Sequence, residues 1–220
     1  KPAGFATHSP DEGKRGLVEI LQERLGQKLW VVHRLDKTTT GAMVFATSAA
    51  RAEELRAAFE EHRVKKTYWF LTDRASDTDE FSVQSLIAKR GSRFESDIAA
   101  PSPNSETRFR RVKRSPFFEL WEAEPLSGRP HQVRLHAANL GLPILGDEIY
   151  GGTPYPHLCL HSNSIQIPGE ELWNCPAPRF FERLGIARDF ELVRILSSID
   201  RRQRIFNFLK KPEETLRLVH

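Results

Sequence analysis

Asp36 is the residue of this chain whose surroundings point most clearly to chemistry. It ends the stretch His-Arg-Leu-Asp of residues 33–36, directly after the apolar segment 29–32. That segment is partly β-branched and predicts a short buried strand, while residues 38–41 (Thr-Thr-Thr-Gly) predict a turn. A carboxylate at the junction of a strand and a loop is aimed by the strand and exposed by the loop. Asp36 is therefore a candidate catalytic acid, with an ordinary surface ion pair as the alternative.

A second polar cluster, residues 128–136, has the sequence Gly-Arg-Pro-His-Gln-Val-Arg-Leu-His. A helix is predicted over 131–140, after the Gly-Arg-Pro break. On this helix His131 and Arg134 share a face, whereas His136 lies about 140° from His131. This spacing argues against a metal site made by two histidines, which needs residues four apart. It allows an arginine to point into a cleft, and the alternative is an arginine on a solvated helix face.

Two further groupings contain polar residues of interest. Tyr68 lies in the strand-like segment 65–72, where a lone aromatic residue is more often part of the core than of a site. Residues 146–152 (Gly-Asp-Glu-Ile-Tyr-Gly-Gly) predict a glycine-bounded turn. Its acids would bind a metal only with matched ligands nearby, so a structural turn is favoured.

The composition predicts a globular protein. With 220 residues, 39% of them hydrophobic, the chain can build one large domain, or one domain plus a fragment. No apolar run approaches the roughly 18 residues needed to cross a bilayer, and residues 1–13 lack the apolar centre of a signal peptide. Cys159 and Cys175 are too few for a disulfide framework or a zinc ribbon. We expect a cytoplasmic monomer with reduced thiols and no membrane segment.

The charge balance mildly favours a polyanionic partner. Lys and Arg number 33 against 29 Asp and Glu, which gives a net charge of +4, and the isoelectric point is near 9.2. Cations concentrate in residues 89–93 and 108–114, with Phe94 and Phe109 beside or among them. These runs fit a surface that grips a nucleic-acid backbone, and they equally fit a solvated strand face.

The order of elements predicts an α+β fold in which helices pack on a mostly antiparallel sheet. Helices are expected over 16–25, 49–61 and 131–140, and strands over 29–32, 42–46, 65–72, 81–87, 105–112 and 117–124. Gly26 is expected to end the first helix, and Ser48 to cap the start of the second.

The character of the chain changes near residue 186. Residues 189–209 predict two amphipathic helical stretches, and 215–220 predict a strand-like end. We therefore expect a main domain over 1–185, and a helical tail over 186–220 that begins a further domain of a longer natural chain. The abrupt, turn-like start at Lys1-Pro2-Ala3-Gly4 suggests that an element precedes it.

Taken in order, the polar groupings resemble the RluA-type RNA pseudouridine synthases. The resemblance covers roughly residues 1–182. It rests on these motifs: Lys1-Pro2-Ala3-Gly4, His33-Arg34-Leu35-Asp36, Thr39-Thr40-Gly41, Lys66-Thr67-Tyr68, Glu106-Thr107, Gly128-Arg129-Pro130-His131-Gln132-Val133-Arg134-Leu135-His136, Gly141, Pro143-Ile144, Gly146-Asp147, Tyr150-Gly151 and Leu160-His161. It implies the pseudouridine synthase fold, an α+β fold with a mixed, mostly antiparallel and bent sheet flanked by helices and loops.

The chain departs from the family pattern at two places. The family usually has Thr-Ser-Gly where this chain has Thr39-Thr40-Gly41, and Gly-Arg-Thr-His where it has Gly128-Arg129-Pro130-His131. Both lie beside the expected chemistry without replacing its groups, and Pro130 suits the first turn of a helix, where its missing N–H is not needed.

The resemblance implies a role for individual residues. Asp36 is implied as the essential aspartate, Tyr68 as the active-site tyrosine, and Arg134 as the arginine that pairs with the aspartate. Arg34 is implied to contact RNA near the displaced base, and Leu160 to line the pocket.

We further expect RNA contacts from Arg129 and His131 in the second polar cluster and from Arg108 and Arg110 in the basic run.

The implied reaction converts a uridine of ribosomal or transfer RNA into pseudouridine and needs no cofactor and no metal. Asp36 would attack C1′, attack C6 of the base, or remove a sugar proton, and the sequence does not separate these steps. A neighbouring Arg134 would favour the ionised carboxylate. Tyr68 would stack on the base, and its phenol would assist removal of the C5 proton. A paired uridine must first flip out of its stem.

Two other functions compete with this one. An RNA-binding module without catalysis would use the same basic surface, although Asp36, Tyr68 and Arg134 are all present. A metal-dependent hydrolase would use Asp36, His33, His131 and Asp147, against the helical spacing noted above. The tail over 188–220 weakly resembles the lead-in to an RNA methyltransferase with a PUA-like start. The target uridine is not indicated by the sequence.

Overall fold

The computed structural model describes residues 1–9, 15–178, 181, 208–211 and 214–218 of the chain. In this part, the strands are β1 (Trp30–Val31), β2 (Thr40–Gly41), β3 (Phe45–Ala46), β4 (Lys65–Thr72), β5 (Glu80–Arg90), β6 (Arg93–Asp97), β7 (Ser105–Arg114), β8 (Glu119–Pro125), β9 (Leu160–Gln166), β10 (Leu172–Asn174), β11 (Phe208–Lys211) and β12 (Glu214–Leu218). The helices are α1 (Leu17–Leu25), α2 (Ala49–Glu60), α3 (Gln132–Asn139) and the 3-10 helix η1 (Glu148–Tyr150).

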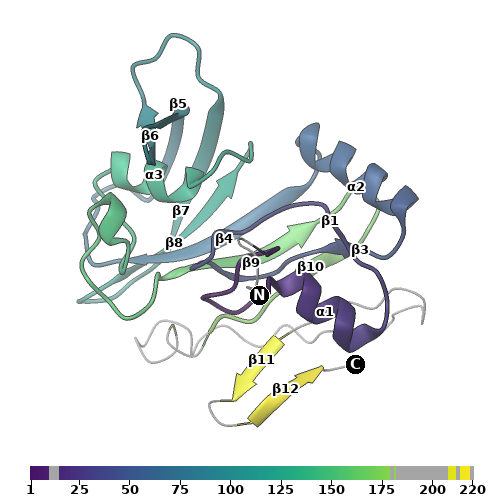
Figure 1. Cartoon of the computed structure of the whole chain (residues 1–220). Coiled ribbons are helices and arrows are strands. Elements are labelled where there is room, and N and C mark those ends of the chain that lie inside the picture. Colours follow the sequence, from purple (N-terminus) through teal and green to yellow (C-terminus); the bar gives the residue numbers. More distant parts are fainter. Residues whose placement is uncertain (10–14, 179–180, 182–207, 212–213, 219–220) are drawn as a thin grey trace.

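One long sheet organises the molecule. Its strand order is β10-β9-β4-β8-β7-β5-β6, and β2 pairs with β9 off this path. The pairings along the path are antiparallel, whereas β2 and β9 run parallel. The β5–β6 hairpin and α3 lie toward one end of the sheet, and α1 and α2 toward the other (Figure 1). The α+β class predicted from the sequence is confirmed.

Several predicted elements form with the expected ends. Strand β4 has the bounds predicted for 65–72. Helix α1 ends at Gly26, whose left-handed φ of 61° suits glycine. Ser48 caps α2, because its side chain accepts a hydrogen bond of 3.2 Å from the Arg51 N–H.

The residues of β7 define two faces of the sheet. Thr107 and Phe109 are buried, whereas Arg108 and Arg110 are exposed, as the period of two in a strand requires. Thr107 Oγ1 lies 2.8 Å from Nδ1 of His136, on α3. We call the face that packs on α3 the inner face and the opposite one the outer face.

The main core lies between the inner face and α3. Phe70, Phe109 and Trp121 come from three neighbouring strands and belong to one buried cluster with Val133 and Ala137 of α3. The rings of Phe70 and Phe109 meet edge to face with their centroids 5.9 Å apart. The apolar side chains of α3 are few, so polar contacts must also hold this helix.

Buried polar side chains of α3 fix its rotation against the sheet. His136 Nε2 lies 2.8 Å from Ser85 Oγ. Gln132 Nε2 donates to the carbonyl of Glu106 at 2.8 Å, and its Oε1 accepts from Ser127 Oγ at 2.8 Å. A buried polar group left without a partner costs about 1–3 kcal/mol, so these bonds restrict α3 to one orientation. That orientation aims Arg134, on the same helix.

The start of α3 differs from the prediction. The helix begins at Gln132, because His131 adopts a left-handed backbone with φ 57° and ψ 16°. Pro130 therefore lies in the turn before the helix, and its predicted place in the first helical turn is wrong. A left-handed backbone at a residue other than glycine costs on the order of 1 kcal/mol, although histidine tolerates it better than most.

The strand predicted over 42–46 is reduced to β3. The Ala42 N–H donates to the carbonyl of Ser162 at 2.8 Å, and the Val44 N–H donates to Nε2 of His33 at 2.9 Å. Because the N–H groups of Ala42 and Val44 bond to Ser162 and His33, they do not pair with β1. Only the Phe45–Ala46 segment pairs with β1.

The sequence prediction missed β6, because it treated 89–93 only as a basic cluster. β6 pairs with β5 through a tight turn, with Arg90 opposite Arg93. Gly91 has a φ of 60°, which such a hairpin turn favours.

The tail is described only in part. Strands β11 and β12 pair antiparallel, with Phe208 opposite Leu218. The strand predicted at the end of the chain is confirmed for 215–218, whereas the helical prediction is wrong for 208–209. The predicted helices over 189–207 and the predicted boundary at 185 lie outside the described residues.

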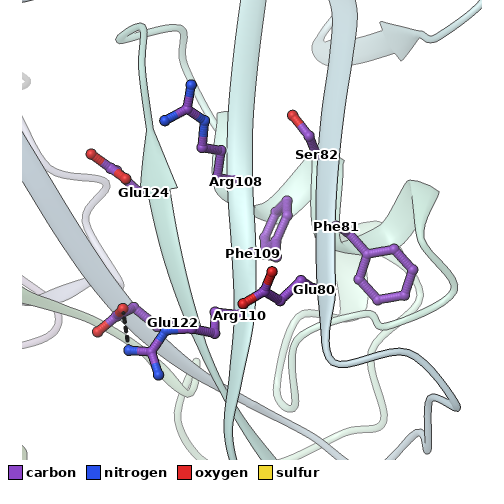
Figure 2. A pocket seen from close by; sticks show the side chains of 8 residues that line it. All are labelled: Glu80, Phe81, Ser82, Arg108, Phe109, Arg110, Glu122 and Glu124. Atoms are coloured by element: carbon purple, nitrogen blue, oxygen red, sulfur yellow. Dashed lines mark hydrogen bonds and ion pairs between the residues drawn. The ribbon is translucent and has the colours of Figure 1, made fainter.

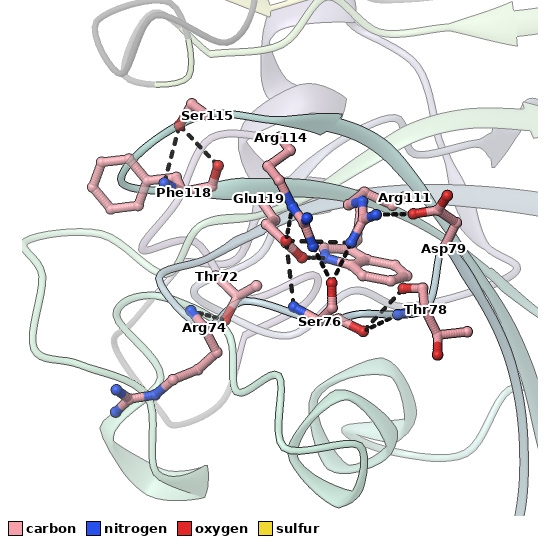
Figure 3. Close-up of polar contacts among 11 residues, drawn as sticks. Thr72, Arg74, Ser76, Thr78, Asp79, Arg111, Arg114, Ser115, Phe118 and Glu119 are labelled. Carbon is pink, nitrogen blue, oxygen red and sulfur yellow. Dashed lines mark hydrogen bonds and ion pairs between the residues drawn. The ribbon is translucent and has the colours of Figure 1, made fainter.

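The second half of the basic run 108–114 supports the fold. Glu119 is buried and accepts hydrogen bonds from Arg114 Nε at 2.7 Å, from Arg111 Nη1 at 3.3 Å and from the Ser76 N–H at 3.3 Å. Ser76 lies in the loop of residues 73–79. Arg111 also pairs with Asp79, at the end of this loop (Figure 3). These two arginines therefore neutralise a buried carboxylate and fix the 73–79 loop.

The buried histidines predict a loss of stability in acid. Burial lowers the pKa of His136 and of His161 to about 4, and that of His33 to about 3, from an ordinary value near 6.5. The unfolded chain therefore binds more protons below pH 6.5, and stability falls as the pH drops from about 6.5 toward 4. Each histidine accounts for about 2 kcal/mol by pH 5. Urea unfolding measured from pH 7 to 5 checks this loss.

The matched variants are His136→Gln and His62→Gln. The first is expected to flatten the dependence of unfolding free energy on pH, whereas His62 is exposed at the end of α2 and its replacement is expected to leave the slope unchanged. Equal slopes in both variants would contradict the assignment.

Candidate active site

Asp36 and Arg134, the acid and the arginine singled out from the sequence, meet in the structure. Arg134 Nη1 lies 3.3 Å from Asp36 Oδ2. The Arg134 side chain is 6% exposed and that of Asp36 is 25% exposed. The contact therefore joins a buried cation to a carboxylate that a ligand can reach.

A second carboxylate holds Arg134 in place. Asp147 is buried and accepts hydrogen bonds from both Nε and Nη2 of Arg134, each 2.7 Å long. This two-bond geometry is the strongest arrangement of an arginine with a carboxylate. Burial disfavours the charged guanidinium, but the hydrogen bonds and charges of Asp147 and Asp36 outweigh it and raise the pKa of Arg134. With Nε and Nη2 occupied, Nη1 faces Asp36.

Contacts from the start of the chain hold the loop that carries Asp36. The Asp36 carbonyl accepts from the Thr39 N–H at 3.1 Å, which closes a tight turn. The next carbonyl, that of Lys37, accepts from the Gly4 N–H and from Lys1 Nζ, each at 2.9 Å. The Lys-Pro-Ala-Gly motif thus supports the Asp36 loop.

The same loop is tied to β9. His161 Nε2 faces the Cys175 carbonyl at 3.0 Å and must donate to it, so Nδ1 accepts from Thr40 Oγ1 at 2.8 Å. A serine hydroxyl at position 40 is able to make the same bond. Gly41 has a φ of 120°, and a Cβ there would lie 2.2 Å from the Ser162 carbonyl oxygen. Only glycine allows β2 to approach β9 this closely.

His33, to which the sequence assigned no role, supports the other side of the loop. Its Nε2 accepts from the Val44 N–H at 2.9 Å, and its ring stacks on Phe59 with centroids 4.6 Å apart. Burial keeps the imidazole neutral by lowering its pKa to about 3. His33 therefore has a structural role next to the site.

His131 and Tyr150 line the site beside Asp36. His131 Nε2 lies 3.9 Å from Asp36 Oδ1, and Nδ1 lies 2.7 Å from Tyr150 Oη. The Arg134 guanidinium lies over the Tyr150 ring, 4.9 Å from its centroid, which is a favourable cation–π distance. The His131 ring thus lies beside Asp36, and the Tyr150 ring lies against Arg134.

Tyr68 approaches the same site from the sheet. It lies on β4 between Ala123 of β8 and Ser162 of β9. Burial and the negative charge of Asp36 both raise the pKa of the Tyr68 phenol, so it is neutral at physiological pH. Leu160 is buried in the main core, opposite Phe70 on the neighbouring strand.

The arginines expected to bind RNA separate into two groups. Arg34 is exposed two residues before Asp36, and Arg129 is exposed just before α3, where its Nε donates to the Asn104 carbonyl at 3.2 Å. Arg108 and Arg110 lie on the outer face, away from α3. The structure therefore does not bring these last two together with Asp36.

The outer face around Arg108 and Arg110 carries both signs of charge. It forms a shallow groove in which Glu80, Glu122 and Glu124 lie beside the two arginines (Figure 2). Arg110 Nη2 pairs with Glu122 Oε1 at 2.8 Å. Contact of this face with RNA stays a prediction.

The model of one protein family, described as RNA pseudouridylate synthase, matches residues 1–139. The chain belongs to this family. The matched region contains Asp36, Tyr68 and Arg134, and the membership confirms the resemblance drawn from the motifs. The similarity of the tail to a methyltransferase lead-in concerns residues outside the match and stays a prediction.

Individual relatives of the synthase carry related names. An uncharacterized RNA pseudouridine synthase of Haemophilus influenzae is 33% identical over 69% of this chain and 67% of its own length. The ribosomal large subunit pseudouridine synthase C of Rickettsia conorii is 35% identical over 75% of this chain and 58% of its own length. The chain thus spans little more than half the length of some relatives.

A solved structure supports the fold of the synthase domain. The human RNA pseudouridylate synthase domain containing 4 superimposes with a TM-score of 0.68, covering 86% of this chain and 88% of that one, at 24% identity. The similarity confirms the pseudouridine synthase fold predicted from the motifs.

Sequence reasoning missed the roles of Asp147 and Tyr150 in the synthase site. Both lie in the glycine-bounded segment 146–152, which was interpreted as a structural turn. The signal was present in the family motifs Gly146-Asp147 and Tyr150-Gly151, but the spacing alone did not show that Asp147 reaches Arg134. A Cβ at Gly146 would lie 2.0 Å from the His157 carbonyl oxygen, so only glycine fits at this position of the turn.

The described residues contain no group of three or more His, Cys, Asp and Glu side chains arranged to hold a metal ion. The same part of the chain has no helix whose length and apolar character would let it cross a bilayer.

We predict that Asp147→Asn destabilises the synthase by about 3 kcal/mol, because it leaves the buried Arg134 without its main counter-charge. The measurement is urea unfolding at pH 7. The matched control is Glu23→Gln, which removes a carboxylate paired with Arg15 at the surface, where both side chains are more than half exposed. Its expected cost is below about 0.5 kcal/mol. Similar costs for both variants would contradict the role given to Asp147.

Proposed function

We propose that this chain isomerises a uridine of RNA to pseudouridine and that Asp36 is its catalytic carboxylate. The observation that carries the proposal is the contact of a partly exposed Asp36 with a buried Arg134, whose other nitrogens are held by Asp147. In the reaction the N1–C1′ bond breaks, the base turns, and a C5–C1′ bond forms. The proton on C5 is lost and N1 gains one, so no co-reactant is consumed.

The positive charge of Arg134 faces the carboxylate of Asp36. In a pocket that closes over a nucleoside, loss of water would favour the protonated acid. A cation 3.3 Å away stabilises the anion that attack on C1′, attack on C6 and removal of a sugar proton all require. The proposal leaves these three steps open, since each needs the same anion at the same place.

Tyr68 is proposed to contact the base. A neutral phenol with a raised pKa is a poor base by itself, because it must give up its own proton to accept another. We therefore assign Tyr68 to stacking on the uracil. Asp36, which is freed once the C5–C1′ bond has formed, is the acceptor proposed for the C5 proton.

RNA binding is proposed to involve the rim of the site. Arg34 and Arg129 are exposed around it, and phosphate contacts from such side chains offset the few kcal/mol needed to flip a base. Arg34 is proposed to occupy the space that the flipped base leaves, and Leu160 to line the pocket. The substrate class proposed is ribosomal or transfer RNA, and a cytoplasmic monomer remains the expectation.

We predict that Asp36→Asn abolishes pseudouridine formation, with a loss of about 10³-fold or more, while the Kd for RNA changes less than about threefold. The measurement is release of tritium from C5-labelled uridine in ribosomal and transfer RNA transcripts. Asp77→Asn, at an exposed loop position, is the matched control and is expected to retain full activity. An active Asp36→Asn variant would overturn the assignment. RNA binding without any turnover by the wild type would favour a non-catalytic module.

We predict that Arg34→Ala lowers kcat/KM about tenfold or more and weakens the salt dependence of RNA binding by about one unit of slope. Arg34 is exposed next to Asp36, whereas Arg110 lies on the outer face and is paired with Glu122. Arg110→Ala is therefore the comparison, with an expected loss below about threefold. Equal losses in the two variants would assign the outer face to RNA as well.

A further inference from the structure

His131 has a geometry that the contact of Arg134 with the two carboxylates does not explain. Its left-handed backbone comes directly before α3. Its ring contacts the rings of Phe94 and Tyr150, whose centroids are 5.5 and 5.7 Å away. Strain of this kind persists where surrounding contacts enforce it, and it concentrates at functional sites.

Contacts with Tyr150 hold the His131 ring in place. Tyr150 Oη lies 2.7 Å from Nδ1 of His131 and 3.3 Å from the Phe94 carbonyl oxygen. Nδ1 is thus occupied by Tyr150, and Nε2 is the ring nitrogen that faces Asp36.

The surroundings of His131 favour the neutral imidazole. Burial lowers its pKa, and the positive charge of Arg134 acts in the same direction, while Asp36 and Asp147 oppose it. Nε2 lies 3.9 Å from Asp36 Oδ1, which is too far for a direct hydrogen bond. A hydroxyl placed between them is able to donate to the carboxylate and to bond Nε2 as well, because a hydroxyl is both a donor and an acceptor.

We propose that the ribose 2′-hydroxyl of the target uridine bridges His131 Nε2 and Asp36 Oδ1 and donates its proton to the carboxylate, which makes His131 a determinant of specificity for RNA. The inference rests on the proposed function, because that function puts Asp36 beside the N1–C1′ bond. The 2′-hydroxyl is attached to the carbon next to C1′ and is the donor nearest to the reacting bond. The other donor of the nucleoside, the N3–H, lies across the uracil ring.

The test compares two synthetic stem-loops built around a uridine that the wild type converts in ribosomal or transfer RNA transcripts. One carries ribose and the other 2′-deoxyribose at that uridine. Both are measured as competitors of the labelled transcript, so that binding is read without turnover. We expect the wild type to bind the ribose form about 30-fold more tightly, because loss of the hydroxyl leaves Nε2 and the carboxylate without the group that bridges them. In His131→Asn the preference is expected to fall below about threefold.

The matched control is His62→Asn, since His62 also has a left-handed backbone, with a φ of 58°, but is exposed after α2 and takes no part in the contacts of Asp36 with His131 and Arg134. It is expected to keep the 30-fold preference. His131→Phe, which keeps a ring without the imidazole nitrogens, replaces His131→Asn if the latter does not fold. A wild type without preference, or a preference unchanged in the folded His131 variant, would overturn the inference. Absence of pseudouridine from every transcript contradicts the proposed function, and the inference falls with it.

Discussion

The buried cation of Arg134 is the constraint on which the site depends. A guanidinium taken out of water costs several kcal/mol unless counter-charges and hydrogen bonds replace its hydration. Two carboxylates do this unequally. Asp147 is buried and uses both oxygens, whereas Asp36 is partly exposed and contributes a single longer contact. One acid thus serves the structure, and the other stays within reach of a ligand.

The sheet separates this chemistry from most of the basic run that the sequence emphasised. Strand alternation sends Arg108 and Arg110 to the outer face, where cross-strand glutamates lie beside them. Arg111 and Arg114 are bound to the buried Glu119. An excess of positive charge along a strand therefore gives little guide to a binding surface, because the neighbouring strand decides how much of that charge is neutralised.

The predictable part of the site was the part encoded locally. The short apolar segment before Asp36, the helix that carries Arg134 and the order of the motifs were enough to predict the pair and the family. The contact of Asp147 with Arg134 was not predictable from spacing, because it depends on how the turn after α3 folds back. The left-handed backbone of His131 was not predictable for a related reason. It is enforced by ring contacts with Phe94 and Tyr150, which come from β6 and η1, and β6 itself was missed.

The parallel pairing of β2 with β9 has a consequence for the order in which the molecule becomes functional. Gly41 lies opposite Ser162, so the loop that carries Asp36 is closed by a strand made more than a hundred residues later. Contacts of such separation form slowly compared with helices and hairpins. The acid is thus synthesised early and positioned late. An N-terminal fragment that stops short of β9 contains Asp36, Tyr68, Arg134 and Asp147, yet lacks the strand that fixes the Asp36 loop. Competence for chemistry arises only when the whole domain has closed.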